Sequence, residues 1–192
     1  MKEISTRERI IEAAYNLFSE NGYLGTKTRE IAKLASVSEV TLFRKFKNKE
    51  TLFTEVLKSK SIIPDLVDAV KKVEQSNIEN TLFSFAKKFY NVLVSKKKFI
   101  MITFSEINHY SEKIIEIYQE LISQIDNLII KILSQNMSIN KNFDLKTIAM
   151  AFRGMIFELF LVNEILLRKK SAKTDIEKIL FSYVKIIIKS IQ

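Results

Sequence analysis

The sequence contains no cysteine, which excludes disulfide frameworks, thiolate metal sites and cysteine nucleophiles. It has only one proline and three glycines in 192 residues. So few helix breakers favour long helices over a sheet with many tight turns. The single histidine leaves no histidine pair for a metal centre and no recognisable catalytic triad. We therefore expect an all-α protein that is not an enzyme and has no metal site and no cofactor.

Long hydrophobic runs are missing as well. The N-terminal stretch MKEISTRERIIE is charged throughout and lacks the apolar core of a signal peptide. The most apolar stretch, residues 155–167, is interrupted by Glu158, Asn163 and Glu164. It is also shorter than the roughly 20 residues that a membrane-spanning helix needs. We expect a soluble, cytoplasmic protein that does not enter a membrane.

Positive charge is abundant and unevenly distributed. The formal net charge is +9, and seven basic against two acidic side chains between Lys27 and Lys49 give that segment a net charge of +5. Such a concentration fits the phosphates of a nucleic acid. An acidic membrane surface and a merely solvated basic face are the alternatives that charge alone leaves open.

Apolar residues at helical spacing predict four helices in the first 63 residues. The first covers residues 5–20 and ends at Asn21-Gly22, and the second is short and begins at Thr26 as N-cap. Ser38 caps a short third helix, and Asn48 caps a fourth that runs until Pro64. Two short helices joined by a tight turn make a helix-turn-helix. The predicted boundaries are a DNA-binding domain at 1–48 and a connecting helix at 49–63.

The third helix has the pattern of a recognition helix, the element that enters the major groove of DNA. Leu42 and Phe46 are four residues apart and are expected to face the core. The outward side is left with Glu39, Thr41, Phe43, Arg44 and Lys45. Thr41 offers a methyl and a hydroxyl to base edges, and Arg44 can read guanine or bind phosphate. Glu39 either accepts from a cytosine amino group or only stabilises the first turn of the helix.

Lys49 stands in the first turn of the fourth helix, where a cation opposes the helix dipole by about 0.3 to 1 kcal/mol. A phosphate bound at this position would reverse that cost, because it would meet both the ammonium group and the unpaired N–H groups of the helix. We therefore expect Lys49 to bind the DNA backbone.

Residues 7–57 resemble the tetracycline-repressor-like (TetR/AcrR) family of bacterial transcriptional regulators. The resemblance rests on RIIEAAYNLFSENGY, TKTREIAKLASVS and TLFRKFKNKETLF in this order and spacing. It implies a homodimeric, all-helical repressor that binds operator DNA through an N-terminal domain and a small molecule through a larger helical domain. It places the opening of the second helix on the DNA backbone, Thr41, Phe43 and Lys45 in the groove, and Lys49 on a phosphate. The complete predicted DNA-binding set is Thr26, Lys27, Thr28, Ser38, Glu39, Thr41, Phe43, Arg44, Lys45 and Lys49.

Four residues depart from the family pattern. Ser36 stands where the turn usually has glycine, and a left-handed backbone there would cost a serine about 1 to 2 kcal/mol. Val40 replaces a usual small residue, Phe43 replaces the common tyrosine and its phosphate donor, and Lys45 adds a charge. We expect DNA binding to persist with an altered operator.

The third predicted region, 64–192, is a helical effector-binding and dimerisation domain with helices near 65–75, 78–95, 98–108, 111–135, 144–168 and 174–190. One helix-turn-helix reads too short a site to be specific, so a two-fold dimer is expected. Residues 143–167 are apolar all round the helix, which implies burial on more than one side. The predicted interface consists of Phe152, Met155, Leu159, Phe160, Phe181, Val184 and Ile188. Gly154 either permits close approach of another helix there or is simply tolerated.

Aromatic residues with sparse polar groups suggest a site for a small hydrophobic effector. The candidates are Phe85, Phe89, Phe104, Asn108, His109, Tyr110 and Glu158. Ordinary core packing is the simpler explanation of the same phenylalanines. The hypothesis is a repressor that its effector releases from DNA. The alternative is a helical scaffold or membrane-surface protein with a degenerate helix-turn-helix.

Overall fold

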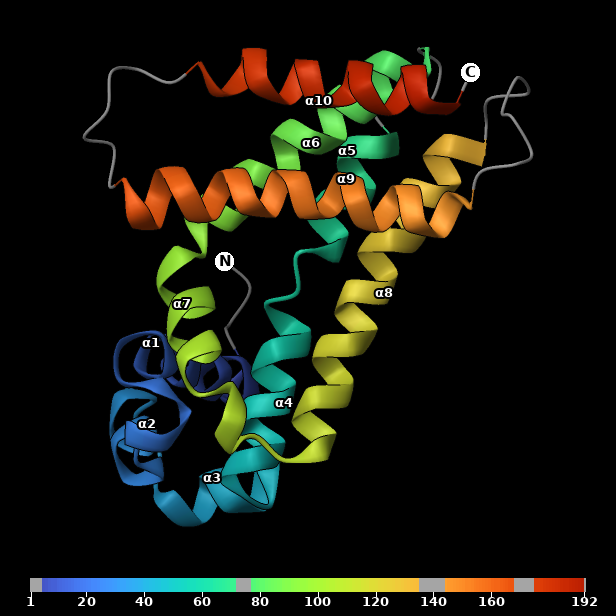
Figure 1. Ribbon diagram of the computed structural model, residues 1–192. Coiled ribbons are helices and arrows are strands. Elements are labelled where there is room, and N and C mark those ends of the chain that lie inside the picture. The colour runs from blue at the N-terminus through green and yellow to red at the C-terminus, as the bar shows by residue number, and fades with distance from the viewer. Residues whose placement is uncertain (1–4, 72–76, 135–143, 168–174, 192) are drawn as a thin grey trace. The chain divides into compact units, whose positions relative to one another are not determined.

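The computed structural model describes residues 5–71, 77–134, 144–167 and 175–191 (Figure 1). Within these ranges the regular structure is entirely helical, which confirms the predicted all-α class. None of the described helices is long and apolar enough to cross a bilayer. The chain divides into two compact units, one made of residues 1–61 and 96–120 and the other of residues 62–95 and 121–192.

The first unit contains the four N-terminal helices and a later segment of the chain. Its elements are α1 (Thr6–Gly25), α2 (Thr28–Leu34), α3 (Glu39–Phe46), α4 (Lys49–Ser59), α7 (Lys97–Ser105), the 3₁₀ turn η1 (Ile107–His109) and the beginning of α8 (Glu112–Ser134). Phe18 and Phe53 meet edge to face at 5.0 Å in the middle of this core. Most apolar positions that predicted the helices are buried, although Leu34 is exposed. The buried ones include Ile10, Ala14, Phe18, Ile31, Leu42, Phe46, Leu52 and Phe53.

Side-chain caps fix where several helices begin. Ser5 and Glu8 form a capping box at α1, Ser38 accepts from the Thr41 N–H at α3, and Asn48 accepts from the Thr51 N–H at α4. The predicted cap at Thr26 is wrong, because α2 begins one residue later and its N-cap, Lys27, makes no side-chain hydrogen bond.

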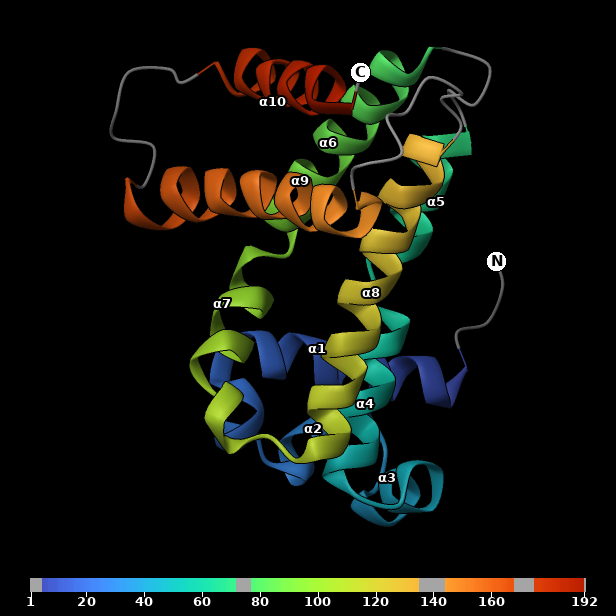
Figure 2. The same ribbon diagram turned by 45° about the vertical axis from the view of Figure 1, so that its right-hand side comes forward.

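The second unit contains α5 (Ile63–Lys71), α6 (Ile78–Ser95), the rest of α8, α9 (Leu145–Phe160) and α10 (Ile176–Ile191). A π-helical segment, η2 (Leu161–Leu166), extends α9. The helices α9 and α10 run antiparallel, side by side, in both views (Figures 1 and 2). Phe85, Phe89, Phe152, Phe160 and Val184 are buried among these elements.

The compact units do not follow the boundaries predicted from the sequence. Residues 96–120 group with the N-terminal helices rather than with the rest of 64–192. The fourth helix ends at Ser59, and Pro64 lies in the first turn of α5, where a proline is tolerated because the N–H it lacks would be unpaired anyway. The predicted helix ends at residues 75, 135, 168 and 174 lie outside the described residues.

Candidate nucleic-acid interface

The turn between α2 and α3 contains the left-handed residue that the sequence suggested. Ser36 has φ 55°, and its N–H donates to the carbonyl of Lys33 at 3.1 Å. The Val37 N–H closes the turn on the carbonyl of Ala32 at 3.0 Å. A serine in this conformation costs about 1 to 2 kcal/mol relative to glycine, so the departure at position 36 carries a real conformational penalty.

The recognition helix α3 separates its two faces as predicted. Leu42 and Phe46 are buried, whereas Phe43, Arg44 and Lys45 are exposed. Thr41 is half-buried, and its hydroxyl lies 2.9 Å from the hydroxyl of the cap, Ser38. Together with the exposed Val40, the outward side of the helix therefore presents one aliphatic side chain, one aromatic ring and two cations.

Glu39 is tied to the preceding helix. Its carboxylate accepts a 2.5 Å hydrogen bond from the hydroxyl of Thr28 at the start of α2, and the Glu39 side chain is half-buried. Of the two roles that the sequence left open, this bond favours the structural one. The bond holds the first turns of α2 and α3 together and occupies one oxygen of the Glu39 carboxylate.

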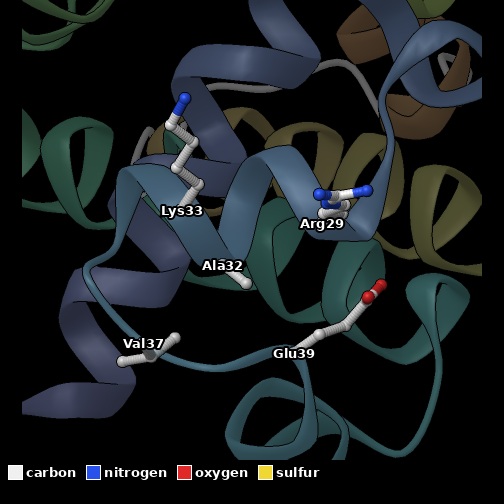
Figure 3. Close-up of a pocket in the computed structure, with 5 residues that line it drawn as sticks. All are labelled: Arg29, Ala32, Lys33, Val37 and Glu39. Carbon is white, nitrogen blue, oxygen red and sulfur yellow. The ribbon is translucent and has the colours of Figure 1, made fainter.

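A shallow hollow of about 450 Å³ lies beside this hydrogen bond, between α2 and the start of α3. Figure 3 shows Arg29 and Lys33 on α2, with the Glu39 carboxylate directed towards α2 from the other side. Ala32 and Val37 supply the apolar lining. Two cations beside an open depression suit the backbone phosphate and sugar of a nucleic acid.

Thr26, which was predicted to contact DNA, is buried. Its hydroxyl donates to the carbonyl of Gly22 at 2.6 Å and is 3.1 Å from the carbonyl of Leu17. The break at Gly22 deprives α1 of regular hydrogen bonds near its end, and the threonine hydroxyl compensates for this loss. The Thr26 side chain therefore belongs to the fold and not to the interface, which corrects the sequence-based assignment.

Lys49 begins α4 and folds back towards the end of α1. Its ammonium nitrogen lies 4.8 Å from the centre of the Tyr23 ring and 3.4 Å from the carbonyl oxygen of Leu24. Partial burial lowers the pKa of Lys49, and the negative charge of Glu106 opposes this shift. The cation is thus held beside residues 23 and 24 at a partly exposed position, where a phosphate can reach it.

The sequence did not reveal the residue that holds the backbone of residues 23 and 24 in place. Glu106, at the end of α7, accepts the backbone N–H of Tyr23 at 2.6 Å and that of Leu24 at 3.1 Å. Both N–H groups follow Gly22, whose φ of 75° and ψ of 175° break the helix. The only available signal was the Asn21-Gly22 break itself, which leaves N–H groups in need of an acceptor.

The residues predicted for the effector do not belong to one unit. Phe85 and Phe89 are fully packed core residues of the second unit, and Glu158 is exposed there. The other four, Phe104, Asn108, His109 and Tyr110, belong to the first unit. The two phenylalanines are explained by core packing, which was the simpler alternative.

Four of the seven residues predicted for the dimer interface are buried within the chain itself: Phe152, Leu159, Phe160 and Val184. A helix that is apolar all round packs one face on its own core, and these residues occupy that face. Their side chains are not available to a second subunit. The other three, Met155, Phe181 and Ile188, are half-buried.

Comparison with known proteins places this helix-turn-helix in a family. Residues 10–56 match the sequence profile of bacterial regulatory proteins of the tetR family. An uncharacterized HTH-type transcriptional regulator of Bacillus subtilis, YvkB, is 33% identical over 114 residues, which are 56% of this chain and 59% of that protein. This helix-turn-helix is a TetR-family domain. This chain matches its curated relatives over less than two thirds of their own length.

Solved structures of similar fold cover nearly the whole chain. A transcriptional regulator (TerR/AcrR family) from Aquifex aeolicus VF5 superposes with a TM-score of 0.70 at 25% identity, covering 95% of this chain and 99% of that one. The transcriptional regulator FadR from Bacillus subtilis, in complex with stearoyl-CoA, superposes with a TM-score of 0.74 at 21% identity, covering 96% and 98%. Both units therefore have the fold of TetR-family proteins.

Proposed function

We propose that this protein is a dimeric, cytoplasmic transcriptional repressor that binds operator DNA through α3 and leaves it when a small hydrophobic molecule binds. One observation carries the DNA-binding part. Within the segment that matches the TetR family, α3 buries Leu42 and Phe46 and presents Phe43, Arg44 and Lys45 outward. A helix with such an outward face is suited to the major groove.

The side chains divide into two kinds of DNA contact. Lys27, Lys45 and Lys49 have flexible ammonium groups that suit phosphates and fix the position of the protein on the duplex. Arg44 can form two parallel hydrogen bonds with the edge of guanine, which carries sequence information. The charge supplies affinity for any duplex, and the α3 residues supply preference for one sequence.

Selection of bound sequences from a random duplex pool at physiological salt tests this function. We expect a two-fold symmetric motif whose half-sites lie one or more helical turns apart. Acidic lipid vesicles serve as the competing target. Recovery of unenriched DNA by folded protein, together with tight binding to the vesicles, would contradict the proposal and favour the membrane-surface alternative.

For the second subunit we propose the outer face of α9 and α10. Met150 and Ile186 are large apolar residues that are exposed on these two helices. Gly154 is exposed one turn after Met150 on α9, and a Cβ added to it would meet, beyond its own helix backbone, no atom of the described residues within 4 Å. Nothing within the described part of the subunit therefore requires glycine here, whereas close approach by a neighbouring subunit would.

Gly154→Leu separates these two explanations. The position is exposed, its added Cβ meets no described atom beyond its own helix, and leucine raises helix propensity by nearly 1 kcal/mol, so the subunit itself should stay folded. We expect sedimentation equilibrium to show a dimer for the parent and a monomer for the variant. An unchanged dimer would remove this face from the interface.

A long-chain acyl thioester is the first effector to test, because FadR of the same fold was crystallised with stearoyl-CoA. The measurements are the thermal stability of the protein and its operator affinity, with stearoyl-CoA and with a panel of other lipophilic ligands. We expect at least one ligand to raise the unfolding temperature and to weaken operator binding. If neither quantity changes across the panel, the hydrophobic-effector part is wrong and DNA binding is unaffected by that result.

A further inference from the structure

We infer that Val40 is a specificity-determining residue that reads the 5-methyl group of a thymine in each operator half-site. The inference rests on the proposed DNA-binding function and names one base contact within it. Val40 is the second residue of α3, in the part of a recognition helix that approaches base edges.

Exposure is the first observation that supports it. Val40 has 78% of its surface exposed, more than any other large apolar side chain in the described residues of the chain. The other aliphatic residue of α3, Leu42, is almost completely buried, as is Phe46. A β-branched residue is also a poorer helix former than alanine. Neither core packing nor helix formation therefore accounts for valine at this position.

The neighbouring polar groups of the first turn are the second observation. The Glu39 carboxylate accepts from Thr28, and the Thr41 hydroxyl is within 2.9 Å of the Ser38 hydroxyl. Local hydrogen bonds thus engage the two polar side chains that flank Val40. In the first turn of α3, Val40 can therefore contact a base without breaking any of these hydrogen bonds.

Thymine is the base that suits such a contact. In the major groove each base pair presents hydrogen-bonding groups, and thymine alone adds a methyl group at C5. A valine that touches it removes apolar surface of both partners from water. Burial of one methylene-sized group is worth about 0.8 kcal/mol, which corresponds to about a fourfold change in affinity.

The experiment combines a substitution in the protein with the removal of one methyl group from the DNA. The selected operator is synthesised with uracil in place of each half-site thymine in turn, which deletes only the methyl group. Dissociation constants are measured for the parent, for Val40→Ala and for Leu34→Ala. Leu34 is the matched control, because it is also apolar and 54% exposed but lies at the end of α2.

We expect one thymine position in the half-site at which uracil weakens binding of the parent protein. Each half-site that carries the substitution should raise the dissociation constant about fourfold. Val40→Ala should bind the thymine and uracil operators equally, while Leu34→Ala should keep the fourfold difference. Because the uracil substitution acts on the unmodified parent, its result does not depend on whether a variant folds.

Three results would overturn the inference: a parent that is insensitive to uracil at every position, a selected half-site without thymine, or a Val40→Ala variant that keeps the full uracil effect. These leave the proposed function intact, because each presupposes a sequence-specific operator. Failure to enrich any motif would overturn the proposed function and this inference with it.

Discussion

Gly22→Ala should destabilise the protein because position 22 combines two constraints. Its φ of 75° and ψ of 175° lie in a region that is essentially restricted to glycine, at a cost of about 1 to 3 kcal/mol for other residues. An added Cβ would also lie 2.6 Å from Cδ and 2.8 Å from Oε2 of Glu106. The Glu106 carboxylate would have to withdraw from the N–H groups of Tyr23 and Leu24.

The expected loss follows from these two parts. Hydrogen bonds to a charged group contribute about 1.5 to 3 kcal/mol each, and partial exposure of Glu106 reduces the sum of the two to about 1 to 2 kcal/mol. Together with the backbone strain, we expect Gly22→Ala to lower the free energy of unfolding by about 2 to 5 kcal/mol. Urea unfolding measures this directly, with the m-value as a check on the unfolded state.

Gly25→Ala is the matched control, because its nearest added contact, to Cβ of Asn21, is an ordinary 3.6 Å and no positive φ is involved. The variant Glu106→Ala completes a double-mutant cycle. Without the carboxylate, Gly22→Ala should cost only the backbone strain, so the two effects should be less than additive. Equal costs for Gly22→Ala and Gly25→Ala, or strict additivity with Glu106→Ala, would refute this reasoning.

Three further predictions concern charge, strain and pH. Lys49→Ala should weaken binding to all duplexes and reduce the slope of log affinity against log salt concentration by about 0.9. Lys71, which is exposed on α5, provides the control, because Lys71→Ala should change neither quantity. If Lys49→Ala and the parent have equal slopes, Lys49 does not contact a phosphate. Ser36→Gly should raise the free energy of unfolding by about 0.5 to 1 kcal/mol, because relief of the left-handed strain outweighs the added flexibility of the unfolded chain. A lower free energy of unfolding for the variant, measured with urea, would show that the serine backbone at φ 55° is not strained. Burial raises the pKa of Tyr118 to about 12, and burial together with the charge of Glu164 raises that of Tyr90 to about 12. The two tyrosines keep their protons to higher pH in the folded protein than in the unfolded chain. Their contribution to the free energy of unfolding is therefore present below pH 10 and should be lost as the pH rises from about 10 to 12. If the tyrosines of the folded protein titrate at the same pH as those of the unfolded chain, this prediction is wrong.

Much of the first unit could be predicted from local sequence. Helix periodicity placed Leu42 and Phe46 inside, and short-range capping rules located Ser38 and Asn48 correctly. The left-handed turn at Ser36 followed from the position of the usual glycine. These features depend on residues a few positions apart, which is the range over which sequence patterns act.

Contacts between distant segments could not be predicted in the same way. Glu106 meets Tyr23 across 83 positions, and no local pattern links a carboxylate in α7 to a helix break in α1. The family resemblance assigned Thr26 to DNA by its position at the opening of the second helix, but two carbonyls of α1 engage its hydroxyl. On α9, apolar residues on every side concealed which face packs on the chain's own core, so Phe152 and Phe160 were misassigned.

The proposed function requires that α3 reads a specific DNA sequence. Its most direct test is the ratio of dissociation constants for the selected operator and for a scrambled duplex of the same length and composition, both at physiological salt. We predict that the operator binds at least about 1,000-fold more tightly, as sequence-specific regulators do. Equal affinities for the two duplexes, with the same dependence on salt, would mean that the basic segment binds phosphates without reading bases, and α3 would not be a recognition helix.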